Sequence, residues 1–264
     1  MEILFINPWD PSRPKGPNLF KSLVSSADDL ICRSLAAAIP KNHSITFVDE
    51  LLEDIDYDSD VDLVALTTFT QVIDRAYEFR KRGKKVVIGG WHVTALPEEG
   101  IQHADSIVIG EGEYTFPQLI KDLENNQLKQ FYEQEEPVDL DSIPLLSKEE
   151  FNKYASGSFL KNIQVSKGCP VGCNFCSISN RKNGHIHRTK SVENVIQEIK
   201  NMPQKMIGFA DPSLTINPKY TKQLFKEMKG LNKKFGGEGN ANVLAKDDEL
   251  LKLAAEAEGV LDGT

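Results

Sequence analysis

This chain of 264 residues is short of the features that mark membrane, secreted and nucleic-acid-binding proteins. It has no run of about 18 apolar residues, the length that a membrane-spanning helix needs, and its first residues form a short strand-like segment instead of a signal peptide. Positive charge is in deficit, with 31 Lys and Arg against 39 Asp and Glu. A nucleic-acid-binding chain usually has the opposite balance. We therefore expect a cytoplasmic protein that binds neither membranes nor nucleic acid.

Cysteine is also rare, yet three of the four cysteines fall within eight residues. In a reducing compartment, such a cluster indicates metal or redox chemistry and not disulfide bonds. The segment directly follows a predicted strand, and its glycine and proline residues make it a loop, which lets three thiolates converge on one centre. These three residues are Cys169, Cys173 and Cys176. Cys32 lies among apolar residues of a predicted helix, and we expect it in the core.

Thiolates are soft ligands that suit zinc, Cu(I) or an iron–sulfur cluster. A structural zinc site needs a fourth ligand, which His185 or His187 could supply. Zinc sites commonly use paired Cys-x₂-Cys segments, however, and here the first spacing is three residues and the second two. A [4Fe–4S] cluster with three cysteine ligands leaves one iron open for a substrate or cofactor. The spacing favours the cluster, and zinc is the alternative.

The first half of the chain alternates short apolar runs with amphipathic stretches. This pattern predicts an α/β fold with a Rossmann-like, doubly wound parallel sheet covered by helices on both faces. The predicted strands are 3–6, 44–48, 61–67, 85–88 and 106–109, and the predicted helices are 19–39, 72–82 and 116–124. We place this first domain at residues 1–126, followed by an acidic, aperiodic connector at 127–159.

The second half, residues 160–264, resumes the alternation. Its predicted strands are 160–165, 206–209 and 236–241, and its predicted helices are 192–200, 220–231 and 247–257. A closed (βα)₈ barrel needs about 200 residues or more, so we expect about three βα units of an incomplete barrel. An incomplete barrel exposes an edge strand, which predicts either self-association or a partner that supplies the rest.

Small and hydroxyl-bearing residues follow three of the predicted strands in the first half. Ligands of parallel sheets bind at the carboxyl ends of the strands, where glycine lets backbone approach a ligand closely. Ordinary tight turns between strand and helix would explain these glycines equally well. The candidates are Thr67, Thr68, Gly89, Gly90, Gly110, Glu111 and Gly112.

The cysteine segment resembles the radical SAM superfamily, whose hallmark is Cys-x₃-Cys-x-aromatic-Cys, with Phe175 at the aromatic position. The resemblance implies a [4Fe–4S] cluster held by the three cysteines, whose open iron binds S-adenosylmethionine (SAM), and Phe175 lying against the adenine. It further implies that Asp211, at the end of the second barrel strand, lies near the methionine amino group of SAM. The second half would then be the N-terminal part of a radical SAM barrel.

The first half resembles the cobalamin-binding domain that precedes this barrel in one branch of the superfamily. The resemblance rests on Gly-Gly-x-His-x-Thr with a following Pro-Glu-Glu, on Gly-Glu-Gly-Glu, and on Leu-Asp-Ser-Ile-Pro, which begin at Gly89, Gly110 and Leu140. It implies that the corrin lies over the strand ends, in contact with the seven candidates named above. The Asp-x-His-x-x-Gly motif is absent, so we do not expect His92 to ligate cobalt.

The sequence thus indicates a cobalamin-dependent radical SAM enzyme that cleaves SAM reductively for methyl transfer or another radical transformation. Its expected partners are a small-molecule or peptide substrate and an electron donor such as flavodoxin or ferredoxin. Two alternatives stay open: a zinc-stabilised α/β binding protein, and a truncated, catalytically incompetent member of the family.

Overall fold

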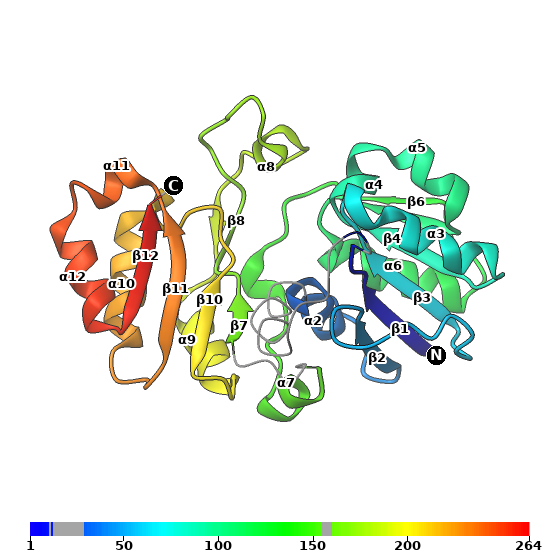
Figure 1. The fold of residues 1–264 in the computed structure, drawn as a ribbon, viewed down its shortest axis with the longest axis horizontal. Helices are drawn as coiled ribbons and strands as arrows, with labels where there is room; N and C mark the ends of the chain where they lie inside the picture. The colour runs from blue at the N-terminus through cyan, green and yellow to red at the C-terminus, as the bar shows by residue number, and fades with distance from the viewer. Residues whose placement is uncertain (11, 13–28, 155–159, 264) are drawn as a thin grey trace. The chain divides into compact units, whose positions relative to one another are not determined.

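The computed structural model of the chain describes residues 1–10, 12, 29–154 and 160–263 (Figure 1). These residues form two compact units, the first comprising 1–10, 12 and 31–138 and the second comprising 29–30, 139–154 and 160–263. None of the helices in these ranges is long and apolar enough to cross a membrane. The two units are described in turn.

The first unit is built on a six-stranded sheet in which every pair of neighbouring strands is parallel. The strands are β1 (Glu2–Asn7), β2 (Ser44–Asp49), β3 (Leu63–Thr67), β4 (Val86–Gly89), β5 (Ser106–Ile109) and β6 (Phe131–Glu133). Their order is β2-β1-β3-β4-β5-β6, so the direction of winding reverses between β1 and β3. Such a reversal creates a crevice at the carboxyl ends of these two strands, where open parallel sheets bind ligands. The α/β fold with a parallel sheet is confirmed, and β6 lies in the stretch that the sequence presents as an aperiodic connector.

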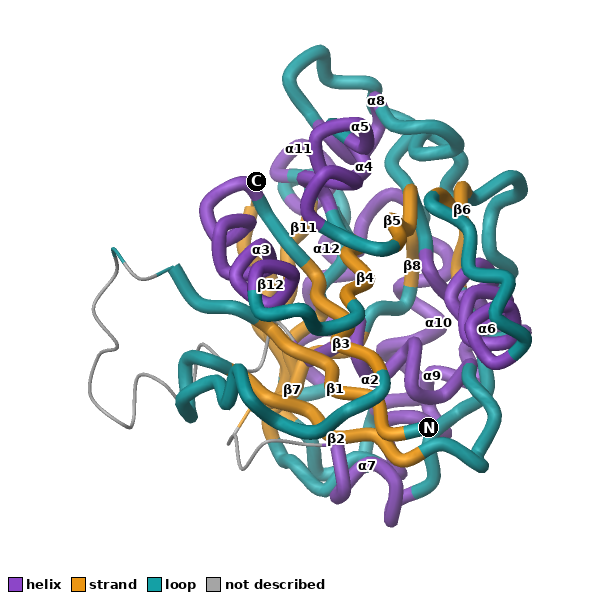
Figure 2. Tube along the Cα trace, turned by 90° about the vertical axis from the view of Figure 1, so that its right-hand side faces the viewer, coloured by secondary structure: helices purple, strands orange, loops and turns teal. Residues whose placement is uncertain are grey.

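Helices cover both faces of this sheet. They are α2 (Asp29–Ala38), α3 (Ile73–Lys81), α4 (Trp91–Ala95), α5 (Pro97–Gly100) and α6 (Gly112–Glu124), with 3₁₀ turns η1 (Thr70–Val72) and η2 (Ile101–His103). Figure 2 shows α3 and α6 on opposite sides of the strands. Helix α2 matches the end of the helix predicted at 19–39, and residues 19–28 lie outside the described part of the chain.

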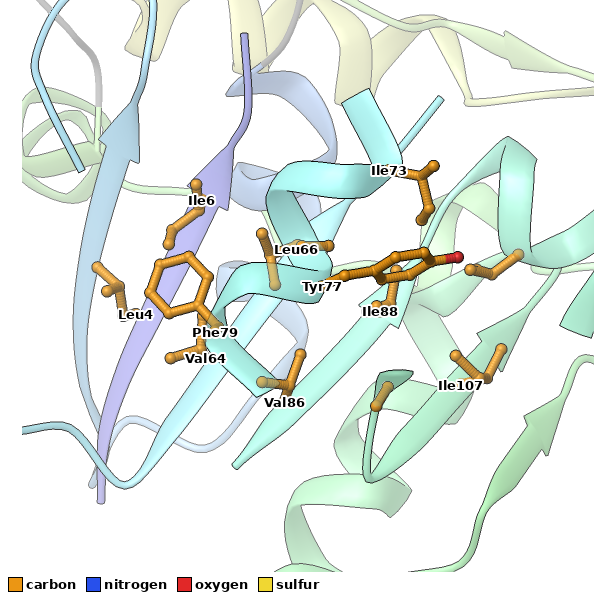
Figure 3. Packing of buried hydrophobic residues seen from close by; sticks show 13 residues of the cluster. Leu4, Ile6, Val64, Leu66, Ile73, Tyr77, Phe79, Val86, Ile88 and Ile107 are labelled. Carbon is orange, nitrogen blue, oxygen red and sulfur yellow. The ribbon is translucent and has the colours of Figure 1, made fainter. Parts of the chain in front are cut away.

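Strand β1 shows why both faces are needed. Alternate side chains of a strand point to opposite faces, and nearly every residue of β1 is buried. The ring of Phe5 packs on Phe116 of α6, with ring centroids 5.4 Å apart. On the other face, Leu4 and Ile6 belong to a cluster with Phe79 of α3 (Figure 3). Full burial of each such side chain stabilises the fold by about 1.5–3 kcal/mol.

The second unit contains a four-stranded parallel sheet in the order β12-β11-β10-β7. Its strands are β7 (Leu160–Ile163), β10 (Met206–Phe209), β11 (Lys234–Gly239) and β12 (Gly259–Gly263). The main helices between them are α9 (Val192–Asn201), α10 (Pro218–Met228) and α12 (Asp248–Glu256). Shorter elements are α7 (Lys148–Tyr154), α8 (Ser177–Asn180), α11 (Ala241–Leu244), η3 (Leu140–Ser142) and η4 (Leu214–Ile216).

The strands of this sheet follow one another in chain order, so each crossover moves in the same direction. Right-handed crossovers then place the helices on one face. In Figure 1, α9, α10 and α12 lie along the same side of the sheet, and α10 contacts both α9 and α12. Helix α9 buries Val192, Val195, Ile196 and Ile199, the stripe that a helix facing a sheet requires.

Candidate functional site

The three clustered cysteines lie on a loop, residues 168–187, that we call the cysteine loop. A short antiparallel pair closes its two ends: β8 (Ser166–Lys167) pairs with β9 (Arg188–Thr189). Gly168 has φ +81°, and a Cβ there would overlap the carbonyl oxygen of Ile186, so this position requires glycine. The next residue, Cys169, donates its N–H to the carbonyl of Gly184 at 2.9 Å. The base of the loop is thus fixed by backbone contacts.

The three cysteines of the loop are free and partly exposed, whereas Cys32 is buried in the first unit, as expected for a core residue. Hydrogen bonds from the backbone N–H groups of Ser179 and Ile178 lower the pKa of the Cys176 thiol. Because the thiolate is the form that binds metals, this position favours the ligand state.

The rest of the turn is held by Asn180, whose side-chain amide donates to the carbonyls of Cys173, Asn174 and Cys176 at 2.8–3.2 Å. The backbone N–H of Cys176 also donates to the carbonyl of Cys173 at 3.0 Å. The last two cysteines therefore share one hydrogen-bonded turn, which leads directly into α8.

The three thiols of this loop are the ligand type that an iron–sulfur cluster requires, although their side chains do not converge on one metal position. Among the residues that the structure describes, no three His, Cys, Asp or Glu side chains are placed to hold a metal ion. His185 and His187, the candidates for a fourth zinc ligand, lie on the same loop. Burial, and next the charge of Arg188, lower the pKa of His187. Phe175 is 93% exposed, so its ring is available to stack on a planar ligand.

Asp211, the residue predicted near SAM, is buried two residues after β10, with only 5% of its surface exposed. Its carboxylate accepts hydrogen bonds from the backbone N–H of Val165 at 3.2 Å and of Ser166 at 2.5 Å, and from the Ser166 hydroxyl at 2.6 Å. Burial raises the pKa of Asp211 to about 6, and these hydrogen bonds act in the opposite direction. The Asp211 carboxylate therefore links the end of β10 to the residues that follow β7.

The candidate residues after β3 and β4 lie close together in the first unit. Gly90 has φ +101°, and a Cβ there would stand 2.6 Å from the backbone nitrogen and oxygen of Thr68, so only glycine fits. Thr68 is fully buried, and its hydroxyl donates to the carbonyl of Gly89 at 3.2 Å. Thr67 and the two glycines are partly exposed and can face a ligand.

After β5, Gly110 and Gly112 are partly exposed, but the residue between them is buried. The carboxylate of Glu111 accepts from the side-chain amide of Gln134 at 3.1 Å and from the backbone N–H of Val138 at 3.3 Å. Its own N–H donates to the Gln134 side-chain oxygen at 2.9 Å. Glu111 thus holds the segment that follows β6. Sequence reasoning missed Gln134 and Val138 because they lie in the aperiodic stretch.

A second group that sequence reasoning missed surrounds His92, at the start of α4. One ring nitrogen, Nδ1, lies 3.1 Å from the Thr70 hydroxyl, and the other, Nε2, lies 2.7 Å from the Glu99 carboxylate. The Tyr77 hydroxyl donates to the same carboxylate at 2.5 Å and lowers the pKa of Glu99. Both ring nitrogens of His92 therefore have partners in the chain. The available signal was the Gly-Gly-x-His segment with its following Pro-Glu-Glu.

No family model matches the chain, but several curated proteins do. It is 36% identical over 215 residues to bacteriochlorophyllide d C-8(2)-methyltransferase of Chlorobaculum tepidum, covering 76% of this chain and 46% of that protein. It is 30% identical over 241 residues to bacteriochlorophyllide d C-12(1)-methyltransferase of the same organism, covering 84% and 52%. It is also 28% identical over 235 residues to the anaerobic magnesium-protoporphyrin IX monomethyl ester cyclase of Cereibacter sphaeroides, covering 74% and 38%.

These relatives, taken with the Cys-x₃-Cys-x-Phe-Cys segment on its closed loop, decide the family. The chain belongs to the radical SAM superfamily. As a radical SAM protein it is related to enzymes that include methyltransferases. The chain spans about half the length of these two methyltransferases.

For a radical SAM protein, the candidate residues fall into two sets, one in each unit. The second unit carries the cysteines and Phe175 on one loop, with Asp211 bonded to the residues that precede it. The first unit carries the glycines and Thr67 at the ends of β3, β4 and β5. Thr68 and Glu111 are also predicted contacts of the first unit with cobalamin, but both side chains make hydrogen bonds within the chain.

Proposed function

We propose that this chain forms part of a cobalamin-dependent radical SAM enzyme that transfers a methyl group to a small-molecule substrate. The observation that carries the proposal is the cysteine loop, with three free thiols on a backbone that is closed at its base. The kinship with two bacteriochlorophyllide methyltransferases supports methyl transfer. The similarity to a cyclase supports another radical transformation as the second candidate reaction.

In this proposal residues 1–126 form the cobalamin-binding domain, and β6 of the 127–159 connector adds an edge strand to its sheet. Residues 160–264 form the N-terminal part of a radical SAM barrel. The order of β2, β1, β3, β4 and β5 supports the first assignment, because it is a doubly wound order that reverses between β1 and β3, the kind of position where such sheets bind ligands. The one-sided covering of the four-stranded parallel sheet supports the last, because barrel helices all lie outside the strands.

The cluster would be held by Cys169, Cys173 and Cys176, and it would supply the electron that cleaves SAM. The chain contributes a lowered thiol pKa at Cys176 and the exposed ring of Phe175, which would lie against the adenine. An electron-transfer protein such as flavodoxin or ferredoxin would deliver the electron, and a reducing cytoplasm would keep the thiols free.

The cobalamin would lie over the partly exposed residues at the strand ends, Thr67, Gly89, Gly90, Gly110 and Gly112. Their small size and backbone polar groups suit a large macrocycle rimmed with amides. Because both ring nitrogens of His92 have partners in the chain, the cofactor would bind without this residue as a cobalt ligand.

The test of the cluster is anaerobic reconstitution of wild type, Cys173→Ala and Cys32→Ala with iron and sulfide. We expect about four irons per chain and absorbance near 400 nm in wild type and Cys32→Ala, and loss of both in Cys173→Ala. Cys32→Ala is the matched control, because this cysteine is buried in the first unit. About one zinc per chain without iron would overturn the proposal and favour the zinc-stabilised binding protein.

The test of the cobalamin half is retention of hydroxocobalamin on gel filtration by wild type, Thr67→Val and Thr46→Val. We expect wild type to retain cobalt and Thr67→Val to retain less, because valine keeps the shape of threonine but lacks its hydroxyl. Thr46 is exposed on β2, an edge strand, and serves as the control. No retained cobalt in wild type would remove cobalamin from the proposal and leave the cluster unaffected.

A further inference from the structure

A buried carboxylate joins two neighbouring strands of the second unit at their carboxyl ends. Strands β7 and β10 are paired, with Phe209 opposite Ile163, and the N–H of Ala210 donates to the carbonyl of Ile163 at 2.9 Å. Asp211 follows β10, while Val165 and Ser166 follow β7. The carboxylate of Asp211 spans the gap and accepts three hydrogen bonds from these two residues, at 2.5–3.2 Å.

The residues that Asp211 holds are the entry to the cysteine loop. Ser166 is the first residue of β8, and its partner across the antiparallel pair is Thr189 of β9. The exit of the loop is held at the same place, since the N–H of Lys190 donates to the carbonyl of Val165 at 2.8 Å. The Asp211 carboxylate therefore fixes the entry of the loop at Ser166, three residues before Cys169. The exit of the loop is attached to the neighbouring residue, Val165.

The geometry assigns Asp211 a role that differs from contact with SAM. One of its oxygens accepts two hydrogen bonds and the other accepts one, all from the chain, and only 5% of the residue is exposed. Withdrawing it toward a ligand would leave the two N–H groups of Val165 and Ser166 buried without an acceptor, which is costly. We infer that Asp211 is a positioning residue for the cysteine loop, acting through Ser166 and the β8–β9 pair.

This inference rests on the proposed cluster, and the first experiment compares cluster binding without SAM. The variants are Asp211→Asn and Ser166→Ala. Asparagine turns one acceptor into a donor that faces N–H groups, and alanine removes only the hydroxyl. Asp248→Asn is the matched control, because Asp248 is exposed in the first turn of α12. After reconstitution, we expect a chelator to remove iron about tenfold faster from both variants than from wild type and the control.

The signal of the reduced cluster in electron paramagnetic resonance gives the second readout. A positioning role predicts a broadened signal in Asp211→Asn and Ser166→Ala before SAM is added, and recovery in Ser166→Thr, which keeps the hydroxyl. A SAM contact predicts the reverse: the SAM-free signal is that of wild type in every variant, and only the change on adding SAM is lost in Asp211→Asn. This second pattern would overturn the inference.

Limited proteolysis of the metal-free proteins separates failure of this inference from failure of the proposed function. If wild type binds no cluster, the proposed function fails, but the cleavage rate of the metal-free loop still shows whether Asp211 stabilises it. We expect cleavage within residues 168–187 to be about tenfold faster in both variants, with thermal unfolding by circular dichroism confirming that each is folded. Equal cleavage in folded variants and wild type would overturn the positioning role.

Discussion

Replacing Gly168 by alanine is expected to open the base of the cysteine loop, and the same change at Gly172 is expected to cost much less. Both glycines have left-handed backbone, with φ +81° and +72°. At Gly168 an added Cβ would overlap the carbonyl oxygen of Ile186, whereas at Gly172 the nearest atom is the Pro170 oxygen, 4.0 Å away. The pair therefore separates backbone strain from steric overlap within one loop.

The magnitude follows from these two contributions. A left-handed backbone costs alanine about 1–2 kcal/mol, and both variants bear that cost. Only Gly168→Ala adds an overlap with a backbone atom, and overpacking costs about 1–3 kcal/mol. We therefore expect Gly168→Ala to destabilise the loop by about 2–5 kcal/mol, and Gly172→Ala by about 1–2 kcal/mol.

The assay is hydrogen exchange at the amide of Cys169, which bonds to the carbonyl of Gly184. Each 1.4 kcal/mol of lost loop stability accelerates exchange about tenfold, so the overlap cost of about 1–3 kcal/mol should make the two variants differ by roughly fivefold to 140-fold. Iron content after reconstitution should fall in the same order. Equal exchange rates and equal iron content in the two variants would show that the overlap at Gly168 does not decide the closure of the loop.

Three further predictions concern buried or hydrogen-bonded side chains. Glu111→Ala removes the acceptor of the buried Val138 N–H and one of the two acceptors of the Gln134 side-chain nitrogen, which also donates to the Glu136 carbonyl. Urea unfolding should therefore show a loss of about 1–3 kcal/mol per lost N–H partner, and a loss below about 0.5 kcal/mol would contradict this. Because the pKa of Asp211 is raised to about 6, ionising it costs stability, which should fall by up to about 3 kcal/mol as the pH rises from about 4 to 6. Urea unfolding at several pH values checks this, and Asp211→Asn should lack that part of the slope. Tyr77→Phe removes the hydrogen bond that most lowers the pKa of Glu99, so carboxyl NMR titration should find that pKa raised toward its ordinary value, and an unchanged pKa would refute the assignment.

The sheet of the first unit could be predicted because its central strands, β1, β3, β4 and β5, are buried on both faces. Such strands read as continuous apolar runs, and the run at Ile3–Ile6 corresponds to β1 (Glu2–Asn7). Strand β6 could not be predicted in the same way, since it has three residues in an acidic stretch and is defined by its pairing with β5. Strands β8 and β9 have two residues each, too few for any periodic signal.

The cysteines could be named as a candidate site because the spacing Cys-x₃-Cys-x-Phe-Cys is itself typical of thiolate ligation. The roles of the carboxylates could not, because a sequence does not show which donors surround an acidic side chain. Asp211 and Glu111 both follow apolar strands and look like ligand contacts, yet each accepts hydrogen bonds from backbone that is distant in sequence. Contact of Asp211 with SAM and of Glu111 with cobalamin both stay predictions, and the response of Asp211→Asn to added SAM tests the first.

The β8–β9 pair also determines how metal capture relates to folding. In small zinc domains the metal closes the chain, so the free energy of binding is spent on folding and removal of the metal unfolds the domain. Here the β8–β9 pair, Gly168 and the buried Asp211 carboxylate close the base of the loop without a metal. The entropy of loop closure is then already lost before a cluster arrives. A chelator should accordingly yield a folded apoprotein that can bind a cluster again. Binding of the cluster would then order the cysteine side chains, whereas the backbone of the loop is already ordered.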